Sequence, residues 1–272
     1  MVSLLGVCLL LFVAVGLSSN RAAIRLRTVL LAFGLQGGIG FVALWTDWGI
    51  AALAAASEYV AALLGYSRAG MEFIFGGLVG TSDSLGFVFA FNVLPVVIFF
   101  SSLIAVLYHA RVMQWMIRIL GGGLRKLLGT SHTESLSAAA NVFVGQAEAP
   151  LVARPYISSM TQSELFAVMV GGMASIAGSV MAGYVALGVP LEYLLAASFM
   201  AAPGGLLMAK LIEPEVDQPS EPSQGEKLAT EQYVNLIDAA ATGAMNGLQM
   251  AGAIGAMSVS YTHLRAHETE AY

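Results

Sequence analysis

Charged residues and cysteine are both scarce in this chain of 272 residues. Asp, Glu, Lys and Arg make up 11% of the sequence, whereas 57% of the residues are hydrophobic. Soluble domains are about one quarter charged, so this composition excludes a water-soluble globule. The single cysteine, Cys8, has no partner for an intramolecular disulfide, and the sequence has no Cys/His cluster for a structural zinc. The composition therefore predicts a protein that folds in a lipid bilayer.

Basic residues are also few and scattered. Twelve Lys and Arg stand against seventeen Asp and Glu, which gives a formal net charge of −5. Binding to nucleic acid needs a concentrated basic face. The sequence therefore argues against a nucleic-acid partner.

Long uncharged runs predict membrane-spanning helices, because about twenty helical residues cross a hydrocarbon core roughly 30 Å thick. The run at residues 1–20 has no positively charged segment before it, which favours a span over a cleaved signal peptide. We predict an all-α polytopic membrane protein with about six transmembrane helices, at residues 1–20, 28–46, 84–108, 163–188, 191–210 and 233–257.

The basic residues predict the orientation of these helices. Nine of the twelve fall on one side if the N-terminus is outside, as the positive-inside rule requires. We therefore expect a multi-pass protein of the cytoplasmic (inner) membrane with its N-terminus outside.

Three segments between the predicted spans differ from them in the content and pattern of polar residues. Glu58, Arg68 and Glu72 interrupt the apolar residues 48–80, which favours an interfacial helix along the outer surface. Residues 111–128 alternate apolar with basic residues and predict an amphipathic helix on the cytoplasmic interface. Residues 213–232 are rich in acids and proline, and we expect an acidic, solvated cytoplasmic linker there.

The segment 134–160 has the apolar content of a span but carries Gln146 and Glu148 in its middle. An ionisable residue at membrane depth marks a functional site by default. Gly145 can leave the helical conformation and Pro150 disrupts the turn before it, so a helix should break between them. Each arm then has about ten residues and about 15 Å of length, half of the bilayer. We predict a re-entrant helical hairpin whose polar tip faces protein or a water-filled cavity.

Two alternatives for this region stay open at this point. Glu148 can instead be a loop carboxylate in water or the partner of Arg154 in a structural salt bridge. The following helix contains glycines at 171, 172, 178 and 183 and serines at 175 and 179, and local unwinding there would free carbonyl and hydroxyl oxygens as ligands for a cation. For Gly171 and Gly172 alone, helix packing is the better interpretation.

Two runs carry a resemblance to the concentrative nucleoside transporters: NVLPVVIFFSSLIAVLYHARVMQWMIRILGGGLRKLLGTSHTESLSA and AANVFVGQAEAPLVARPYISSMTQSELFAVMVGGMASIAGSVMAGY. The resemblance covers about residues 85–256. It implies sodium-coupled uptake of nucleosides by a homotrimer with an elevator motion, no enzymatic activity, and no cofactor other than sodium as coupling ion. It also implies scaffold-type helices in residues 1–110 and a transport-type region in residues 111–212.

The same resemblance implies a set of site residues. The substrate-binding residues would be Gln146 and Glu148 at the nucleobase, Ala147 between them and Val180 as an apolar contact. An amide and a carboxylate can pair the donors and acceptors of a base. Ala147 stands where many members have threonine, which leaves the preference for purines or pyrimidines open. The sodium ligands would be the side-chain oxygens and backbone carbonyls of Asn141, Val144, Ser175 and Ile176.

The end of the sequence departs from the family. Members continue into a second hairpin, whereas residues 258–272 abandon the apolar pattern and read as a non-native tail. We therefore expect a truncated fragment that is inactive alone, with a tail that forms no helix. A channel or membrane assembly protein built on a hairpin repeat is the alternative function. An intramembrane hydrolase using Ser175 or Ser179 is disfavoured, because nothing places a base within reach of either serine.

Overall fold

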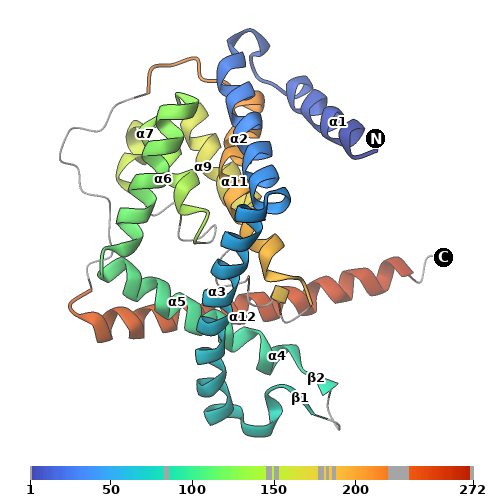
Figure 1. Ribbon diagram of the computed structural model, residues 1–272, viewed down its shortest axis with the longest axis vertical. Coiled ribbons are helices and arrows are strands. Elements are labelled where there is room, and N and C mark those ends of the chain that lie inside the picture. The colour runs from blue at the N-terminus through green and yellow to red at the C-terminus, as the bar shows by residue number, and fades with distance from the viewer. Residues whose placement is uncertain are drawn as a thin grey trace. The chain divides into compact units, whose positions relative to one another are not determined.

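The computed structural model describes residues 2–82, 86–144, 149, 153–176, 181, 184–185, 188–219 and 233–269. These residues are mostly helical (Figure 1). The chain divides into two compact units. Unit 1 comprises Met1–Ala54, Val112–Gly178 and Glu192–Glu231, and unit 2 comprises Ala55–Arg111, Ser179–Leu191 and Gln232–Tyr272.

Unit 1 is built from apolar helices around one fully buried short helix. Its elements are α1 (Val2–Gly16), η1 (Arg21–Ala23), α2 (Leu26–Trp45), the start of α3, α6 (Val112–Leu128), α7 (His132–Ala140), η3 (Arg154–Ser159), α9 (Gln162–Ala174) and most of α11 (Leu191–Ile212). Helix α6 packs against α7, and α7 packs against α9 (Figure 1). Residues 133–140 of α7 are all buried, so this helix forms the core of the unit.

Helix α6 is amphipathic. Its buried residues recur at helical spacing, at Met113, Ile117, Gly121, Leu124 and Leu128, which is the pattern of a helix with one face on a core. The hydroxyl of Thr28 in α2 donates to the carbonyl of Leu128 at 3.0 Å and ties the end of α6 to α2.

Unit 2 contains a close crossing of two helices. Its elements are the rest of α3 (Asp47–Phe75), η2 (Gly76–Leu78), β1 (Thr81–Ser82), β2 (Gly86–Phe87), α4 (Phe89–Asn92), α5 (Leu94–His109) and α12 (Leu236–Thr269). Helix α12 lies across α5 (Figure 1). A Cβ on Gly243 would lie 2.6 Å from Ala105 Cβ, and one on Gly247 would lie 2.7 Å from Ile98 Cα. Small residues at this spacing let two helices approach closely.

The described helices differ from the expected spans in number. Four are long and apolar enough to cross a membrane: Leu26–Trp45, Asp47–Leu78, Phe89–His109 and Leu191–Ile212. Helix α1 has 15 residues and reaches only about 22 Å. The segment expected to lie along the outer surface is one of the four by length and composition. The count of six spans and the surface position of α3 therefore stay predictions.

Several boundaries also differ from those expected. The antiparallel pair β1 and β2 adds a small strand ladder to a chain expected to be all-α. Helix α7 ends at Ala140, before Gly145, and within the expected second arm residues Arg154–Ser159 form the 3₁₀ helix η3. Helix α9 ends at Ala174 rather than at residue 188. Helix α12 continues to Thr269, through residues expected to form no helix, because residues 258–269 contain no Gly or Pro to end it.

Candidate functional site

Two helices of unit 1 end at residues with oxygen-bearing side chains. Helix α7 is followed by Asn141, which still has helical dihedral angles, and α9 is followed by Ser175, whose φ of −106° and ψ of 155° are extended. The backbone therefore leaves the helix at Ser175, four residues beyond Gly171. The glycine pair 171 and 172 remains inside α9, as expected for glycines that serve helix packing.

These two helix ends meet. The hydroxyl of Ser175 donates to Oδ1 of Asn141 at 3.4 Å. Asn141 is 1% exposed, and a Cβ placed on Gly171 would lie 2.8 Å from its Nδ2. Gly171 is thus needed because it leaves room for the Asn141 amide. The same Nδ2 is buried and has no hydrogen-bond partner among the described residues.

The structure describes only some of the other expected site residues. Val144 follows Asn141 by three residues and is fully buried, and Ile176 follows Ser175 and is half-buried. Gln146, Ala147, Glu148 and Val180 lie outside the described residues. The structure therefore brings together Asn141 and Ser175 from the expected set.

The chemistry of this junction suits a hard monovalent cation. The last carbonyls of a helix lack intrahelical partners and carry the negative end of the helix dipole. Asn141 and Ser175 add an amide oxygen and a hydroxyl oxygen, and hard cations prefer oxygen ligands. Among the described residues, no group of three or more His, Cys, Asp or Glu side chains could hold a metal ion.

The opposite ends of the same helices share a second arrangement. Both begin with a capping box, Ser131 with Glu134 in α7 and Thr161 with Glu164 in α9. Glu134 Oε1 accepts from the Ser131 amide at 2.6 Å, and Glu164 Oε2 accepts from the Thr161 amide at 2.9 Å. Each box satisfies two backbone donors that the first helical turn leaves free.

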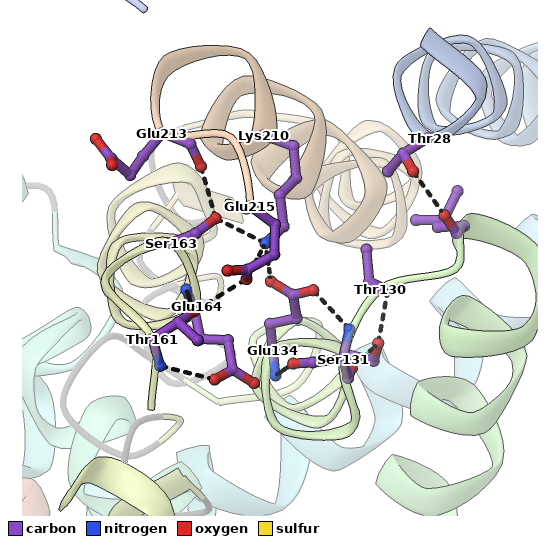
Figure 2. Close-up of polar contacts among 12 residues, drawn as sticks. Thr28, Thr130, Ser131, Glu134, Thr161, Ser163, Glu164, Lys210, Glu213 and Glu215 are labelled. Atoms are coloured by element: carbon purple, nitrogen blue, oxygen red, sulfur yellow. Dashed lines mark hydrogen bonds and ion pairs between the residues drawn. The ribbon is translucent and has the colours of Figure 1, made fainter. Parts of the chain in front are cut away.

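A single lysine contacts both of these helix starts. Figure 2 shows Lys210, near the end of α11, reaching between α7 and α9. Its Nζ lies 2.6 Å from Glu134 Oε2 and 3.5 Å from Glu215 Oε2, and it donates to Ser163 Oγ at 2.9 Å. These three contacts equal the three N–H donors of an ammonium group.

Further bonds extend this network. Thr161 Oγ1 donates to Glu215 Oε2 at 2.9 Å, and Ser163 Oγ donates to the carbonyl of Glu213 at 2.6 Å (Figure 2). We call Ser131, Glu134, Thr161, Ser163, Glu164, Lys210, Glu213 and Glu215 the Lys210 network.

The charges of the network are buried. Glu134 is 2% exposed, Glu164 1% and Lys210 7%. Burial raises the pKa of the Glu134 carboxyl above its ordinary value, and the Lys210 ammonium acts in the opposite direction. Glu134 itself lies outside the four helices that are long enough to span a membrane. A cavity of about 40 Å³ beside Lys210, Glu134 and Glu215 has room for a water molecule to solvate these groups.

Sequence reasoning missed the Lys210 network. The spacing of Ser131 to Glu134 and of Thr161 to Glu164 is a readable signature of two helix starts. From the sequence alone, Lys210 is one of the nine basic residues predicted to lie on the inner side of the membrane. Its partners lie 76 and 47 positions earlier in the sequence, at Glu134 and Ser163, so no local pattern pairs them.

Comparisons with known proteins identify the family. The model described as Na+ dependent nucleoside transporter N-terminus matches residues 5–78. The nucleoside recognition (Gate) model matches residues 90–191, and the model of the transporter C-terminus matches residues 193–266. The N-terminal and C-terminal models describe Na+ dependent nucleoside transporters, not enzymes.

Individual relatives agree with this result. The chain is 53% identical over 264 residues to an uncharacterized transporter of Haemophilus influenzae, covering 97% of the chain and 63% of that protein. It is 46% identical over 268 residues to the nucleoside permease NupC of Helicobacter pylori, again covering 97% of the chain and 63% of the relative. The chain thus spans just under two thirds of the length of these relatives.

Solved structures show the same similarity. The chain matches the structure of CNTnw in an inward-facing, substrate-bound state with a TM-score of 0.91 and 52% identity, over 97% of this chain and 63% of that one. Three models of one family, which together match most of the chain, and relatives of this identity lead to one conclusion: the chain belongs to the concentrative, Na+-dependent nucleoside transporter family.

Proposed function

We propose that the protein carrying this chain takes up nucleosides across a membrane and couples this uptake to the entry of sodium. The observation that carries the proposal is the contact between Asn141 and Ser175, two oxygen-bearing residues at two helix ends that meet in a buried position. The matching family of Na+ dependent nucleoside transporters and the similarity to the nucleoside permease NupC support nucleoside as the substrate and sodium as the coupling ion.

In this proposal the sodium ligands are Asn141 Oδ1, Ser175 Oγ and the carbonyls of Val144 and Ile176. In the structure Asn141 Oδ1 and Ser175 Oγ lie 3.4 Å apart, so both oxygens can contact one cation at a ligand distance of about 2.4 Å. The cation would replace the hydrogen bond between them, and the Ser175 hydroxyl hydrogen would turn away from Asn141.

We also propose a re-entrant hairpin at residues 134–160 that presents the substrate-binding residues Gln146, Ala147 and Glu148, with Val180 as an apolar contact. Two features support it. Helix α7 has nine residues and is too short to cross a bilayer alone. In addition, the segment after it carries an amide and a carboxylate that can pair with a nucleobase.

The proposed setting is a cytoplasmic membrane, with the N-terminus outside and the lipid bilayer around the apolar helices. Large apolar side chains of α1 and α2 are exposed, including Leu5 at 70%, Phe12 at 76% and Trp45 at 77%, which suits helices facing lipid. We further propose a homotrimer that works by an elevator motion, as the family resemblance implies.

Uptake into proteoliposomes tests this function. The product of the complete reading frame would be reconstituted, and labelled uridine and adenosine would be followed under an inward sodium gradient and in choline without sodium. We expect accumulation above the external concentration in sodium alone. A channel only equilibrates its solute, so uptake that stops at the external concentration under a sodium gradient would contradict the symporter and favour the channel.

A further inference from the structure

We infer that Lys210 is a positioning residue: its ammonium holds the first turns of α7 and α9 together and thereby sets how Asn141 and Ser175 meet at the far ends of the same helices. This inference rests on the proposed binding of sodium by that pair. It concerns the Lys210 network, which touches neither the ion nor the nucleoside.

The first step is the geometry of the ammonium. Lys210 Nζ contacts Glu134 in the first turn of α7, Ser163 in the first turn of α9, and Glu215 just after α11. Each of its three donors is directed to a different segment of the chain. The ammonium therefore fixes three segments relative to one another, whereas an ordinary ion pair fixes two.

The second step is the match between charges and helix dipoles. Glu134 and Glu164 stand at the starts of α7 and α9, and Lys210 stands in the last turn of α11. Acids are favoured at the positive N-terminal end of a helix and bases at the negative C-terminal end. The network therefore holds two helix starts and one helix end by a favourable arrangement of both charges and dipoles.

The third step is the rigidity of the two helices. Asn141 follows Glu134 by seven positions along α7, and Ser175 follows Ser163 by twelve positions along α9. These separations correspond to about 10 Å and about 18 Å of helix. A shift of one helix start against the other is carried along such short helices to the contact of 3.4 Å between Ser175 and Asn141.

Sodium-dependent thermal stability of the product of the complete reading frame, in detergent, tests the inference. Melting is followed in rising sodium chloride, with choline chloride keeping the ionic strength constant, and the readout is the sodium concentration for half-maximal stabilisation. The variants are Lys210→Met, Ser163→Ala and the triple variant Lys210→Met/Glu134→Gln/Glu215→Gln. Ser158→Ala is the matched control, because Ser158 is an exposed serine of the same unit.

Lys210→Met alone should lower the melting temperature, because it leaves buried carboxylates without their cation. The triple variant removes those charges and should regain most of the melting temperature. Its half-maximal sodium concentration should nevertheless stay raised by about 2- to 30-fold, the range over which residues remote from a site modulate its binding. Ser163→Ala removes the contact of Lys210 with α9 without changing any charge, and it should also raise the half-maximal sodium concentration.

A merely structural role predicts the opposite for the triple variant, with sodium affinity returning together with stability. That result would overturn the inference. An unchanged half-maximal sodium concentration in Ser163→Ala would overturn it as well, and the Ser163→Ala variant decides the question if the triple variant does not fold. Absence of any sodium effect on the wild-type chain would instead contradict the proposed sodium site and the inference with it.

Discussion

The hydroxyl of Ser175 donates to the amide oxygen of Asn141 at 3.4 Å, where α9 and α7 end. The two helices also begin side by side, since Lys210 contacts Glu134 at the start of one and Ser163 at the start of the other. One pair of short helices therefore has a polar junction at each end. The junction at Asn141 suits a cation, and the junction at Lys210 is already neutralised in part by its own ion pairs.

Replacing Asn141 with alanine should remove the response to sodium and cost the sodium-free chain only a modest loss of stability. The lost hydrogen bond from Ser175 is offset in part, because Asn141 Nδ2 is buried without a hydrogen-bond partner among the described residues and its removal restores part of a desolvation cost. The loss of a proposed ligand should weaken sodium binding by at least about tenfold, since even residues behind the ligands contribute that much. Melting curves in sodium and in choline check both effects. A sodium response like that of the wild type would exclude Asn141 as a ligand.

Gly171→Ala should destabilise the chain and weaken sodium binding together. The added methyl group would lie 2.8 Å from Asn141 Nδ2 and would push the amide away from Ser175. Overpacking of this kind typically costs about 1–3 kcal/mol. The comparison is Gly122→Ala on α6, where a Cβ meets nothing within 4 Å and the better helix propensity of alanine should raise stability by up to about 1 kcal/mol. Equal melting temperatures for the two variants would contradict the close contact.

Thr161→Ala should cost more stability than Ser131→Ala, although both remove the side-chain cap of a helix. A lost cap costs about 1 kcal/mol, and Thr161 Oγ1 also donates to Glu215 Oε2 at 2.9 Å. A hydrogen bond to a charged group adds about 1.5–3 kcal/mol. Thr161→Ser keeps both bonds and serves as the control. Thermal unfolding orders the three variants, and a larger loss in Ser131→Ala would argue against the bond to Glu215.

Glu148→Gln should abolish high-affinity binding of nucleoside in the product of the complete reading frame, with little effect on expression. Losing a charged hydrogen-bond partner costs about 1.5–3 kcal/mol, which isothermal titration resolves. If the affinity is unchanged, Glu148 is a solvated residue of a loop, and the proposed substrate pocket lies elsewhere.

Local patterns predicted much of this fold. The apolar runs and the amphipathic spacing of α6 can be read from neighbouring residues, because a helix repeats its faces every three or four positions. Local unwinding was expected in the glycine- and serine-rich helix after residue 160, with packing the better interpretation of Gly171 and Gly172 alone. The structure uses Gly171 as space for Asn141 and leaves the helix at Ser175. Which of these two roles a glycine has depends on its neighbour in space.

Long-range contacts could not be predicted in the same way. The ion pair of Lys210 and Glu134 joins residues 76 positions apart. Taken alone, Lys210 would be interpreted as a basic residue near the membrane surface, and Glu134 as an acid that caps a helix. The pairing of Asn141 with Ser175 was available only through the family resemblance. Their contact depends on how α7 packs against α9, which no local pattern in the sequence specifies.

The proposed sodium coupling is tested most directly by measuring uptake of one protein under a sodium gradient and, separately, under a proton gradient. Proteoliposomes holding the product of the complete reading frame are placed either in an inward sodium gradient at equal pH, or in sodium-free choline with an inward proton gradient. Labelled nucleoside should accumulate above its external concentration in the first case and only equilibrate or stay outside in the second, because Asn141 and Ser175 offer neutral oxygen ligands that suit sodium. Equal accumulation under the proton gradient in choline would contradict sodium coupling.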